Sequence, residues 1–506
     1  MILCPICPPS AVRLHGRRNR EVPLFCICIM RKTKIVCTIG PASSDRGMIE
    51  KLLRAGMNVA RLNFSHGTHE HHAQTIHDIR AVRDRLGLPA AIMLDTKGPE
   101  IRLRHFAGGK ATLRKGERFV LTTREIEGDD KIASITYEDL PRQVKAGDHV
   151  LIDDGRIRLS VDAVEETEMI CTVEVGGVVS DHKSINLPGA RLDMPYLSPS
   201  DEADIRLGIE MDVDFIAASF VRRKEDVIAL RKFVDYWGGR NIRIIAKIEN
   251  MEGIENFDEI LRYADGIMVA RGDMGVEVAF ERLPGLQKQF IRKCYRAGKM
   301  VITATQMLES MIHSPTPTRA EITDVANAVF DGTSAVMLSG ETAMGDYPEQ
   351  AVQVMASIAR QAEQDAFSMG VWRHAQFELD SSDTTNAICD AACTTARDLG
   401  AAVIIAVTKS GTTARRVSKF RPSEPIVAAT PVPKTFHQLS LSWGVYPVLS
   451  QMQDNSDELF LHAIDCAKQI DAVKVGDIAV ITAGVPLNLA GTTNLLKVQV
   501  VEDNLD

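Results

Sequence analysis

Short aliphatic runs alternate with amphipathic stretches along most of the chain, from Lys32 onward. Buried parallel strands form nearly continuous apolar segments, whereas helices place apolar residues about every 3.6 positions. The alternation predicts a parallel sheet whose strands are joined by crossover helices. Strands are expected at residues 34–38, 58–63, 90–95, 215–219, 243–248, 266–270, 300–303 and 335–338. Eight such repeats predict an α/β fold, a closed (β/α)8 TIM barrel built from residues 30–97 and 196–361.

A different pattern interrupts the barrel between its third and fourth strands, at residues 98–195. Val, Thr, Glu and Gly alternate there and are separated by short turns, as at residues 147–161 and 169–179. A period of two predicts an inserted antiparallel domain, a β-barrel lid over the catalytic end. The segment Asp153-Asp154-Gly155 is typical of a hairpin turn, and a catalytic role for it stays open.

A third α/β pattern follows the barrel and occupies residues 362–506. Its strands are expected at residues 403–407, 425–429, 445–449, 478–482 and 496–501. Helical stretches between them indicate a separate, doubly wound C-terminal domain.

Composition and charge narrow the choice of ligands. The 506 residues carry a formal net charge of -8 and have a pI near 6.0. This balance argues against broad binding to nucleic acid or to an anionic membrane, but it suits a phosphorylated metabolite. No apolar run approaches the roughly twenty residues that cross a bilayer. We expect neither a nucleic-acid partner nor a membrane partner.

The cysteines fall into two groups. Cys4, Cys7, Cys26 and Cys28 crowd into residues 1–29, and six others are scattered among apolar neighbours. The scattered set is typical of reduced core cysteines in a cytoplasmic protein. Residues 1–29 have no small-residue cleavage site, so we expect a disordered or non-native extension before Met30 rather than a secretion signal. A zinc site in this extension is the alternative.

Charged side chains follow several of the expected strands. Lys247 and Glu249 are two positions apart among aliphatic residues and share one face of a strand. Asp273 follows the next strand. Buried charges cost several kcal/mol unless they are compensated, so their convergence at the carboxyl end of a barrel predicts a metal ion and an anionic substrate. A structural salt bridge between Lys247 and Glu249 is the alternative.

A second group of polar residues lies at the ends of the expected second and third strands. Arg61, Asn63 and Ser65 alternate onto one face, and Asp95 and Thr96 end the next strand. A guanidinium suits a phosphate or a carboxylate, and Arg102 supplies another one. The oxygen donors carry little excess charge, which suits a monovalent cation.

Seven segments of the chain form a recognisable set: TKIVCTIGPAS at 33–43, GMNVARLNFSH at 56–66, LDTKGPEIR at 94–102, IAKIEN at 245–250, IMVARGDMGVE at 267–277, ATQMLESM at 304–311 and PTPTRAEITDVANA at 315–328. Together they resemble the pyruvate kinase family, in its bacterial type, from Met30 to the carboxyl terminus. Agreement at so many ordered sites is highly specific. The resemblance implies a phosphotransferase that moves the phosphoryl group of phosphoenolpyruvate to ADP and protonates the enolate to pyruvate in glycolysis.

The resemblance also implies roles for individual residues. Lys247, Thr305 and Arg61 would be catalytic, with Thr305 serving proton delivery. Phosphoenolpyruvate would contact Arg61, Lys247, Gly272, Asp273 and Thr305, and ADP would contact Asn63, His66 and Arg102. Glu249 and Asp273 would hold Mg²⁺ or Mn²⁺, and Asn63, Ser65, Asp95 and Thr96 would hold K⁺.

Two positions bear on the K⁺ dependence and on the binding of ADP. Family members with a glutamate at the position of Glu100 generally need K⁺, so we expect K⁺ dependence. Ser200 stands where relatives often carry a lysine that contacts the nucleotide, which leaves the details of ADP binding open.

The loop Thr408, Lys409, Ser410, Gly411, Thr412 and Thr413 follows a strand and opens a helix. It offers hydroxyls and backbone N–H groups to a phosphate, and similar family loops bind an activating sugar phosphate. The effector's identity stays open, with a sugar monophosphate and AMP as candidates and residues 483–494 as a candidate facing loop. An ordinary glycine turn is the alternative.

Family likeness further implies a cytoplasmic homotetramer. Two other functions stay open at this point. One is a metal-dependent pyruvate-enolate aldolase on the same kind of barrel, and the other is a noncatalytic, effector-binding relative.

Overall fold

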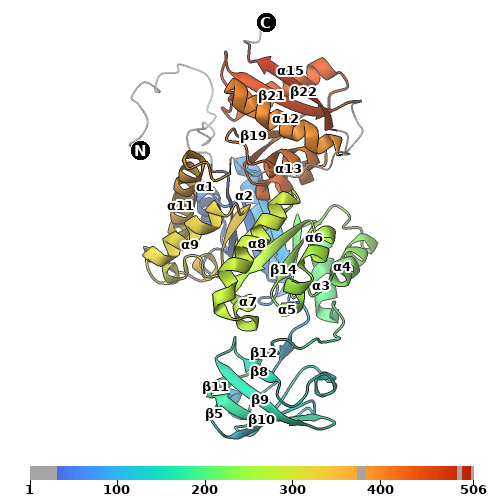
Figure 1. The fold of residues 1–506 in the computed structure, drawn as a ribbon, viewed down its shortest axis with the longest axis vertical. Coiled ribbons are helices and arrows are strands. Elements are labelled where there is room, and N and C mark those ends of the chain that lie inside the picture. The colour runs from blue at the N-terminus through green and yellow to red at the C-terminus, as the bar shows by residue number, and fades with distance from the viewer. Residues whose placement is uncertain (1–30, 373–382, 487–492, 503–506) are drawn as a thin grey trace.

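The computed structural model describes residues 31–372, 383–486 and 493–502. The expected extension at residues 1–29, with its four cysteines, and much of the loop facing Thr408–Thr413 lie outside these residues. Figure 1 shows three parts, with the barrel in the middle, the inserted β domain at one end and the C-terminal domain at the other.

The central part is a closed barrel of parallel strands. Its strands are β1 (Lys34–Ile39), β2 (Val59–Asn63), β3 (Ala91–Asp95), β13 (Phe215–Ala218), β14 (Arg243–Ile248), β15 (Gly266–Ala270), β16 (Met300–Ala304) and β17 (Ala335–Leu338). They follow one another around the barrel in chain order, and β17 pairs with β1. The (β/α)8 prediction is confirmed, and each strand end differs from the expected one by at most a single residue.

The barrel helices cover the outside of this sheet. They are α1 (Arg46–Ala55), α2 (His69–Leu86), α3 (Pro199–Glu210), α4 (Lys224–Tyr236), α5 (Met251–Glu255), α6 (Phe257–Tyr263), α7 (Arg271–Glu277), α8 (Leu283–Arg296), α9 (Arg319–Phe330), α10 (Gly340–Ala343) and α11 (Pro348–Ser368). α11 runs past residue 361, where the sequence places the end of the barrel.

Two hydrophobic layers explain why the strands read as continuous apolar runs. One face of each strand packs against the helices, and the other fills the barrel interior with side chains such as Val36, Met93 and Phe215. Because both faces are buried, nearly every strand position is apolar. Polar side chains are therefore confined mainly to the strand ends, where the candidate site lies.

The inserted domain forms a seven-stranded sheet and a two-stranded sheet. Its strands are β4 (Ile101–Arg102), β5 (Lys110–Leu113), β6 (Arg118–Thr122), β7 (Ile132–Ser134), β8 (His149–Ile152), β9 (Ile157–Val164), β10 (Glu168–Val175), β11 (Gly177–Ser180) and β12 (Ser184–Asn186). Most pairs are antiparallel as expected, but β6 and β7 are parallel. Asp153 and Asp154 both have positive φ values, 53° and 56°, in the β8–β9 hairpin that the sequence predicts.

The C-terminal domain is a five-stranded sheet flanked by helices. Its strands are β18 (Val403–Val407), β19 (Ile426–Thr430), β20 (Val445–Leu449), β21 (Ile478–Gly484) and β22 (Thr493–Val500), in the order β20-β19-β18-β21-β22. Its helices are α12 (Thr384–Leu399), α13 (Thr412–Lys419), α14 (Pro433–Gln438) and α15 (Ser456–Gln469). Among the described strands of this domain, only β22 runs antiparallel to its neighbour.

The scattered cysteines, Cys37 among them, are buried and unpaired as expected. Within the described ranges, no helix combines the length and apolar character needed to cross a bilayer.

Candidate active site

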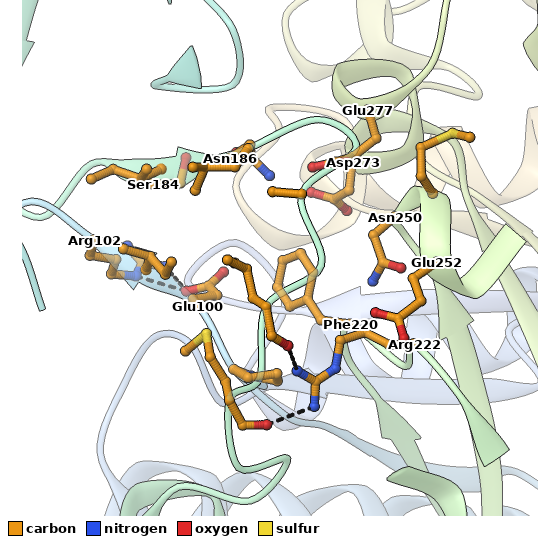
Figure 2. A pocket seen from close by; sticks show the side chains of 18 of the residues that line it. Glu100, Arg102, Ser184, Asn186, Phe220, Arg222, Asn250, Glu252, Asp273 and Glu277 are labelled. Atoms are coloured by element: carbon orange, nitrogen blue, oxygen red, sulfur yellow. Dashed lines mark hydrogen bonds and ion pairs between the residues drawn. The ribbon is translucent and has the colours of Figure 1, made fainter. Parts of the chain in front are cut away.

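A cleft of about 610 Å³ lies between the barrel and the inserted domain. Barrel residues such as Asn250 and Asp273 form one wall, and residues of the inserted domain such as Ser184 and Asn186 form another. Figure 2 shows Asp273 and Glu277 facing the chain that carries Asn186. The inserted domain therefore borders the carboxyl ends of the strands, as the sequence predicts for a lid.

Lys247 lies at the carboxyl end of β14 and is almost completely buried. Its Nζ is 2.9 Å from Oε1 of Glu249 and 3.1 Å from Oδ1 of Asp95, and it donates to Oγ of Ser219 at 2.7 Å. Burial alone would lower the pKa of Lys247, but the carboxylates of Asp95 and Glu249 more than offset it and hold this pKa above its usual value. The lysine is therefore a fixed positive charge at the strand ends, although it is not one of the residues that line the cleft.

Arg61 is held next to this lysine by the neighbouring strands. Its Nε donates to Oδ2 of Asp95 at 2.5 Å, and Nη1 donates to Oγ1 of Thr38 at 2.9 Å. Although burial would raise the pKa of Asp95, Arg61 and Lys247 keep it below its ordinary value. Asp95 thus fixes two cations at one place, which creates a preorganised site for an anion.

Glu249 is buried and lies near a second carboxylate. Its Oε2 accepts the Phe220 N–H at 2.5 Å. Burial raises the pKa of Glu249, and the negative charge of Asp273 raises it further, against the opposing effect of Lys247. A bound cation would relieve this destabilised negative charge.

The donor set fits Mg²⁺ rather than a metal held entirely by protein. Among the described residues, no group of three or more His, Cys, Asp or Glu side chains has a metal-binding arrangement. Mg²⁺ commonly takes only one or two carboxylates and completes its shell with water and substrate oxygens. The carboxylates of Glu249 and Asp273 meet that requirement.

Thr305 follows β16 in a strained backbone. It has a φ of 69° and the next residue, Gln306, has 52°, values that are unusual for residues other than glycine. Its Oγ1 accepts the Gly272 N–H at 2.9 Å and donates to the Ala304 carbonyl at 2.7 Å, while Arg271 Nη2 donates to the Thr305 carbonyl at 2.6 Å. Surrounding contacts therefore hold the hydroxyl against Gly272.

Glu100 and Arg102 form an ion pair on the lid side of the cleft, with Nε of Arg102 2.7 Å from Oε2 of Glu100. Arg102 Nη1 also donates to the His182 carbonyl at 2.8 Å. Burial raises the pKa of Glu100 in spite of Arg102. His66 lines the same cleft, so two of the expected nucleotide contacts border it.

The four residues expected to bind K⁺ lie at neighbouring strand ends. Asn63 and Asp95 are register partners on β2 and β3. Asn63 Oδ1 accepts the Ser65 N–H at 3.2 Å, and Thr96 Oγ1 accepts the Ser219 N–H at 3.1 Å. The four residues thus lie at adjacent strand ends, where Asp95 already binds two cationic side chains.

Ser200 lies near another cation. Nζ of Lys97 donates to Oγ of Ser200 at 3.1 Å and is 3.6 Å from Oδ2 of Asp204. A positive charge thus accompanies the serine that replaces the expected lysine. It lies at the start of α3 and not among the residues that line the cleft.

The candidate effector loop joins β18 to α13. Gly411 has a φ of 77°, and its N–H donates to Oγ1 of Thr408 at 3.0 Å. Ser410 and Thr412 hydroxyls are 2.9 Å apart, and the hydroxyls of Thr413 and Thr493 are 2.7 Å apart. Hydroxyls therefore cluster at the start of the helix and against β22.

The sequence did not point to two residues of the site, Ser219 and Glu277. Ser219 donates to Oδ1 of Asp95 at 3.2 Å and accepts from Lys247, so it lies between the two charges. Its position at the end of an expected strand is the signal that could have identified it. Glu277 also lines the cleft, and burial raises its pKa to about 6.

The fold and the site together define a TIM-barrel enzyme whose cleft, between the barrel and the inserted domain, suits an anionic substrate and a divalent cation. The family model described as "Pyruvate kinase, barrel domain" matches residues 30–352, and "Pyruvate kinase, alpha/beta domain" matches residues 386–499. Both parts of the chain therefore resemble one family.

Individual relatives agree with the family models. A pyruvate kinase of Clostridium acetobutylicum is 48% identical over 94% of this chain and 100% of its own length. One from Staphylococcus haemolyticus is 49% identical over 94% of this chain and 81% of its own length. The crystal structure of a pyruvate kinase from Cryptosporidium parvum superposes with a TM-score of 0.88 at 40% identity, covering 93% of this chain and 96% of that one. The chain belongs to the pyruvate kinase family and is a phosphotransferase.

Proposed function

We propose that this site carries out the pyruvate kinase reaction, transfer of the phosphoryl group of phosphoenolpyruvate to ADP, with the residues acting as follows. Two anionic reactants must approach in line, so charge compensation is the main task of the protein. Lys247 and Arg61, held by Asp95, neutralise the transferring phosphoryl group. Arg102, together with His66 and Asn63, receives the phosphates of ADP.

The observation that carries this proposal is the buried cation of Lys247 with Glu249 2.9 Å away at the carboxyl ends of the barrel strands. In a structural salt bridge the charges would satisfy each other. Here Lys247 has two carboxylate partners, and Glu249 keeps a raised pKa beside Asp273. The carboxylate of Glu249 is thus not fully stabilised by Lys247, which suits a site that receives both an anion and a cation.

Glu249 and Asp273 are the proposed ligands of Mg²⁺ or Mn²⁺. The bound ion supplies charge neutralisation and polarises substrate oxygens. Asp273 and Gly272 contact the substrate at the start of α7. Glu249 keeps its acceptor geometry through the Phe220 N–H, which orients the carboxylate before any ligand arrives.

Thr305 is the proposed residue for proton delivery to the enolate carbon. Its hydroxyl is fixed by Gly272 and Ala304, and its strained φ of 69° is maintained by the Arg271 contacts. Strain held in place by the surrounding structure is typical of functional positions. A water molecule passing the proton from this hydroxyl suits the geometry.

K⁺ is the proposed monovalent cofactor, bound by oxygens of Asn63, Ser65, Asp95 and Thr96. Glu100 supports this assignment because it places a negative charge beside Arg102 where a lysine would provide a positive one. A K⁺-free, Na⁺-free assay tests it, and unchanged turnover contradicts it.

The loop 408–413 is the proposed effector site, and its ligand is a sugar monophosphate or AMP. The clustered hydroxyls and the α13 amino terminus support a phosphate ligand there. Ser410→Asp would repel this phosphate and abolish activation without changing basal turnover. Activation that survives this substitution contradicts the assignment.

Assembly, location and domain roles complete the proposal. We place the chain in the cytoplasm as a homotetramer, with residues 98–195 as the lid, residues 362–506 as the regulatory domain and residues 1–29 as a dispensable extension. Mass photometry of the full chain and of a chain starting at Met30 tests the assembly and the extension together.

The decisive experiment is a coupled pyruvate assay with phosphoenolpyruvate and ADP, varied in Mg²⁺, K⁺ and phosphometabolites. Strict dependence on ADP is expected. Pyruvate formation from a keto-acid substrate without ADP would instead indicate an aldolase, and binding of effectors without turnover would indicate a noncatalytic relative.

A further inference from the structure

The chain returns from the inserted domain to the barrel through a linker, residues 187–197, between β12 and α3. These residues form neither helix nor strand, although Ala190 donates its N–H to the Leu187 carbonyl at 3.1 Å. Leu192 and Met194 of the linker line the active-site cleft. The path of the linker therefore shapes one wall of the cleft.

Arg222, which follows β13 in the barrel, binds the linker through two of its carbonyls. Nη1 donates to the Leu192 carbonyl and Nη2 donates to the Met194 carbonyl, both at 2.9 Å. Figure 2 shows both contacts as dashed lines from the guanidinium of Arg222. The side chain is only 9% exposed. Its planar fork thus fixes two alternate residues of the linker to the barrel.

The residue between these two, Asp193, is held by the inserted domain instead. Its N–H donates to Oε1 of Gln143 at 2.8 Å, and its carbonyl accepts from the Tyr137 hydroxyl at 3.2 Å. Nε2 of Gln143 donates to the same hydroxyl at 2.6 Å. Residues 192–194 are therefore bound by the barrel and by the inserted domain at once.

Arg222 is itself fixed to the barrel. Its Nε and Nη2 donate to Oδ2 and Oδ1 of Asp226 at 3.2 and 3.1 Å, and its backbone N–H donates to Oδ2 at 2.9 Å. Nδ2 of Asn256 donates to the Arg222 carbonyl at 3.0 Å. A buried Arg–Asp pair can serve stability alone. Here two of the three guanidinium nitrogens also reach the linker, so the pair holds a wall of the cleft.

The linker leads directly to a residue of the proposed nucleotide site. It begins where β12 ends, at Asn186, and β12 pairs with β4 so that Ser184 and Arg102 are register partners. Arg102 borders the cleft from the inserted domain, whereas Arg61 and Lys247 belong to barrel strands. A shift of the linker therefore moves Arg102 and leaves the two barrel cations in place.

We propose that Arg222 is a positioning residue for the reaction, which sets where the inserted domain places Arg102 over the cleft. This inference rests on the proposed function, in which Arg102 receives the phosphates of ADP. Arg222 acts on the nucleotide through Arg102 and does not contact it. A misplacement of about 1 Å at a reacting group can cost about 10²-fold in rate, so the position of the linker matters for turnover. Residues 187–191, between the bound segment and β12, are left as the hinge.

Two variants and a matched control test this role in the full-length protein. Arg222→Met removes both linker contacts. Arg222→Lys keeps a charge for Asp226, but one ammonium replaces the fork that spans two carbonyls. Arg83→Met is the control, because the Arg83 side chain is 7% exposed and its Nη1 donates to the Ala90 carbonyl at 2.7 Å and to Oδ2 of Asp214 at 3.4 Å. Arg83 does not line the cleft.

Steady-state kinetics should separate the two reactants. Arg222→Met should raise the Michaelis constant for ADP about tenfold, the loss expected when one charged contact is displaced. The constant for phosphoenolpyruvate should stay within about twofold, because its cations belong to the barrel. Arg222→Lys should lie between wild type and Arg222→Met, and Arg83→Met should keep both constants within about twofold of wild type.

Hydrogen exchange followed by mass spectrometry reports on the linker without any reactant. Exchange at residues 187–194 should be faster in Arg222→Met than in wild type, because the segment loses its attachment to the barrel. Arg83→Met should exchange like wild type in this segment.

Equal Michaelis constants for ADP in wild type and folded Arg222→Met would overturn the proposal. So would equal rises for both reactants, or linker exchange that matches wild type. If Arg222→Met fails to fold, Arg222→Lys decides the question, and an unchanged constant for ADP in that variant overturns the proposal. A wild-type chain without turnover would refute the proposed function and this inference with it, whereas the other outcomes, in an active wild type, refute this inference alone.

Discussion

Replacing Lys247 with methionine tests the centre of the proposed mechanism. Methionine fills a similar volume but removes the ammonium that contacts Asp95, Ser219 and Glu249 at 2.7–3.1 Å. A single preorganised charge aimed at a transition state is worth about 10³-fold in rate, or ~4 kcal/mol. We expect the turnover number to fall by at least about 10³-fold, with a smaller change in the Michaelis constant for ADP.

The same substitution should lower the free energy of unfolding, and the contacts that remain around Asp95 and Glu249 limit the loss. Breaking a buried ion pair costs about 3–5 kcal/mol. Asp95 keeps Arg61 and Ser219, and Glu249, whose pKa is already raised, can take up a proton. The loss should therefore lie at or below the lower end of that range, and the variant should fold.

A matched control separates lost chemistry from lost stability. Lys34 is a buried lysine at the opposite end of the barrel, and its Nζ donates to the Val445 carbonyl at 2.7 Å. Lys34→Met should keep the turnover number within about twofold of wild type. A coupled pyruvate assay and urea unfolding measure both properties. The reasoning is refuted if folded Lys247→Met turns over within tenfold of wild type.

The remaining predictions concern proton delivery, pH and K⁺. Thr305→Ala should lower turnover about 10²-fold, whereas Thr305→Ser should stay within tenfold; equal losses in steady-state assays would argue that the hydroxyl is not used. Burial lowers the pKa of Lys34 to about 7 from 10.5, so between these values the unfolded chain binds a proton that the folded one does not. Stability should therefore rise with pH across that window, by up to about 1.4 kcal/mol per pH unit. Lys34→Met should flatten the rise in urea unfolding from pH 7 to 9, and an unchanged slope would contradict the assigned cause. Glu100→Lys should reduce the activation by K⁺, measured in Na⁺-free buffer; a variant as K⁺-dependent as wild type would remove Glu100 from the cation site.

The local pattern of apolar and polar residues was enough to predict the barrel strands and to show which polar residues lie at their ends. Strands buried on both faces are nearly continuous apolar runs, so β14 was visible as a run with Lys247 near its end, and β15 as a run shortly before Asp273. The pairing of β6 with β7 was not visible, because strand direction depends on the path of the connection and not on residue period.

Contacts between distant segments were decided only by the tertiary structure. Asp95 and Lys247 are 152 residues apart, and they meet because barrel closure brings the ends of β3 and β14 around the same opening. Ser219 and Phe220 enter the site for the same reason. The junction of α8 and α13 likewise depends on the packing of two different domains, and a linear sequence carries no periodic signal for it. Periodicity records which face of an element is buried, whereas the identity of its neighbour follows from how the whole chain closes.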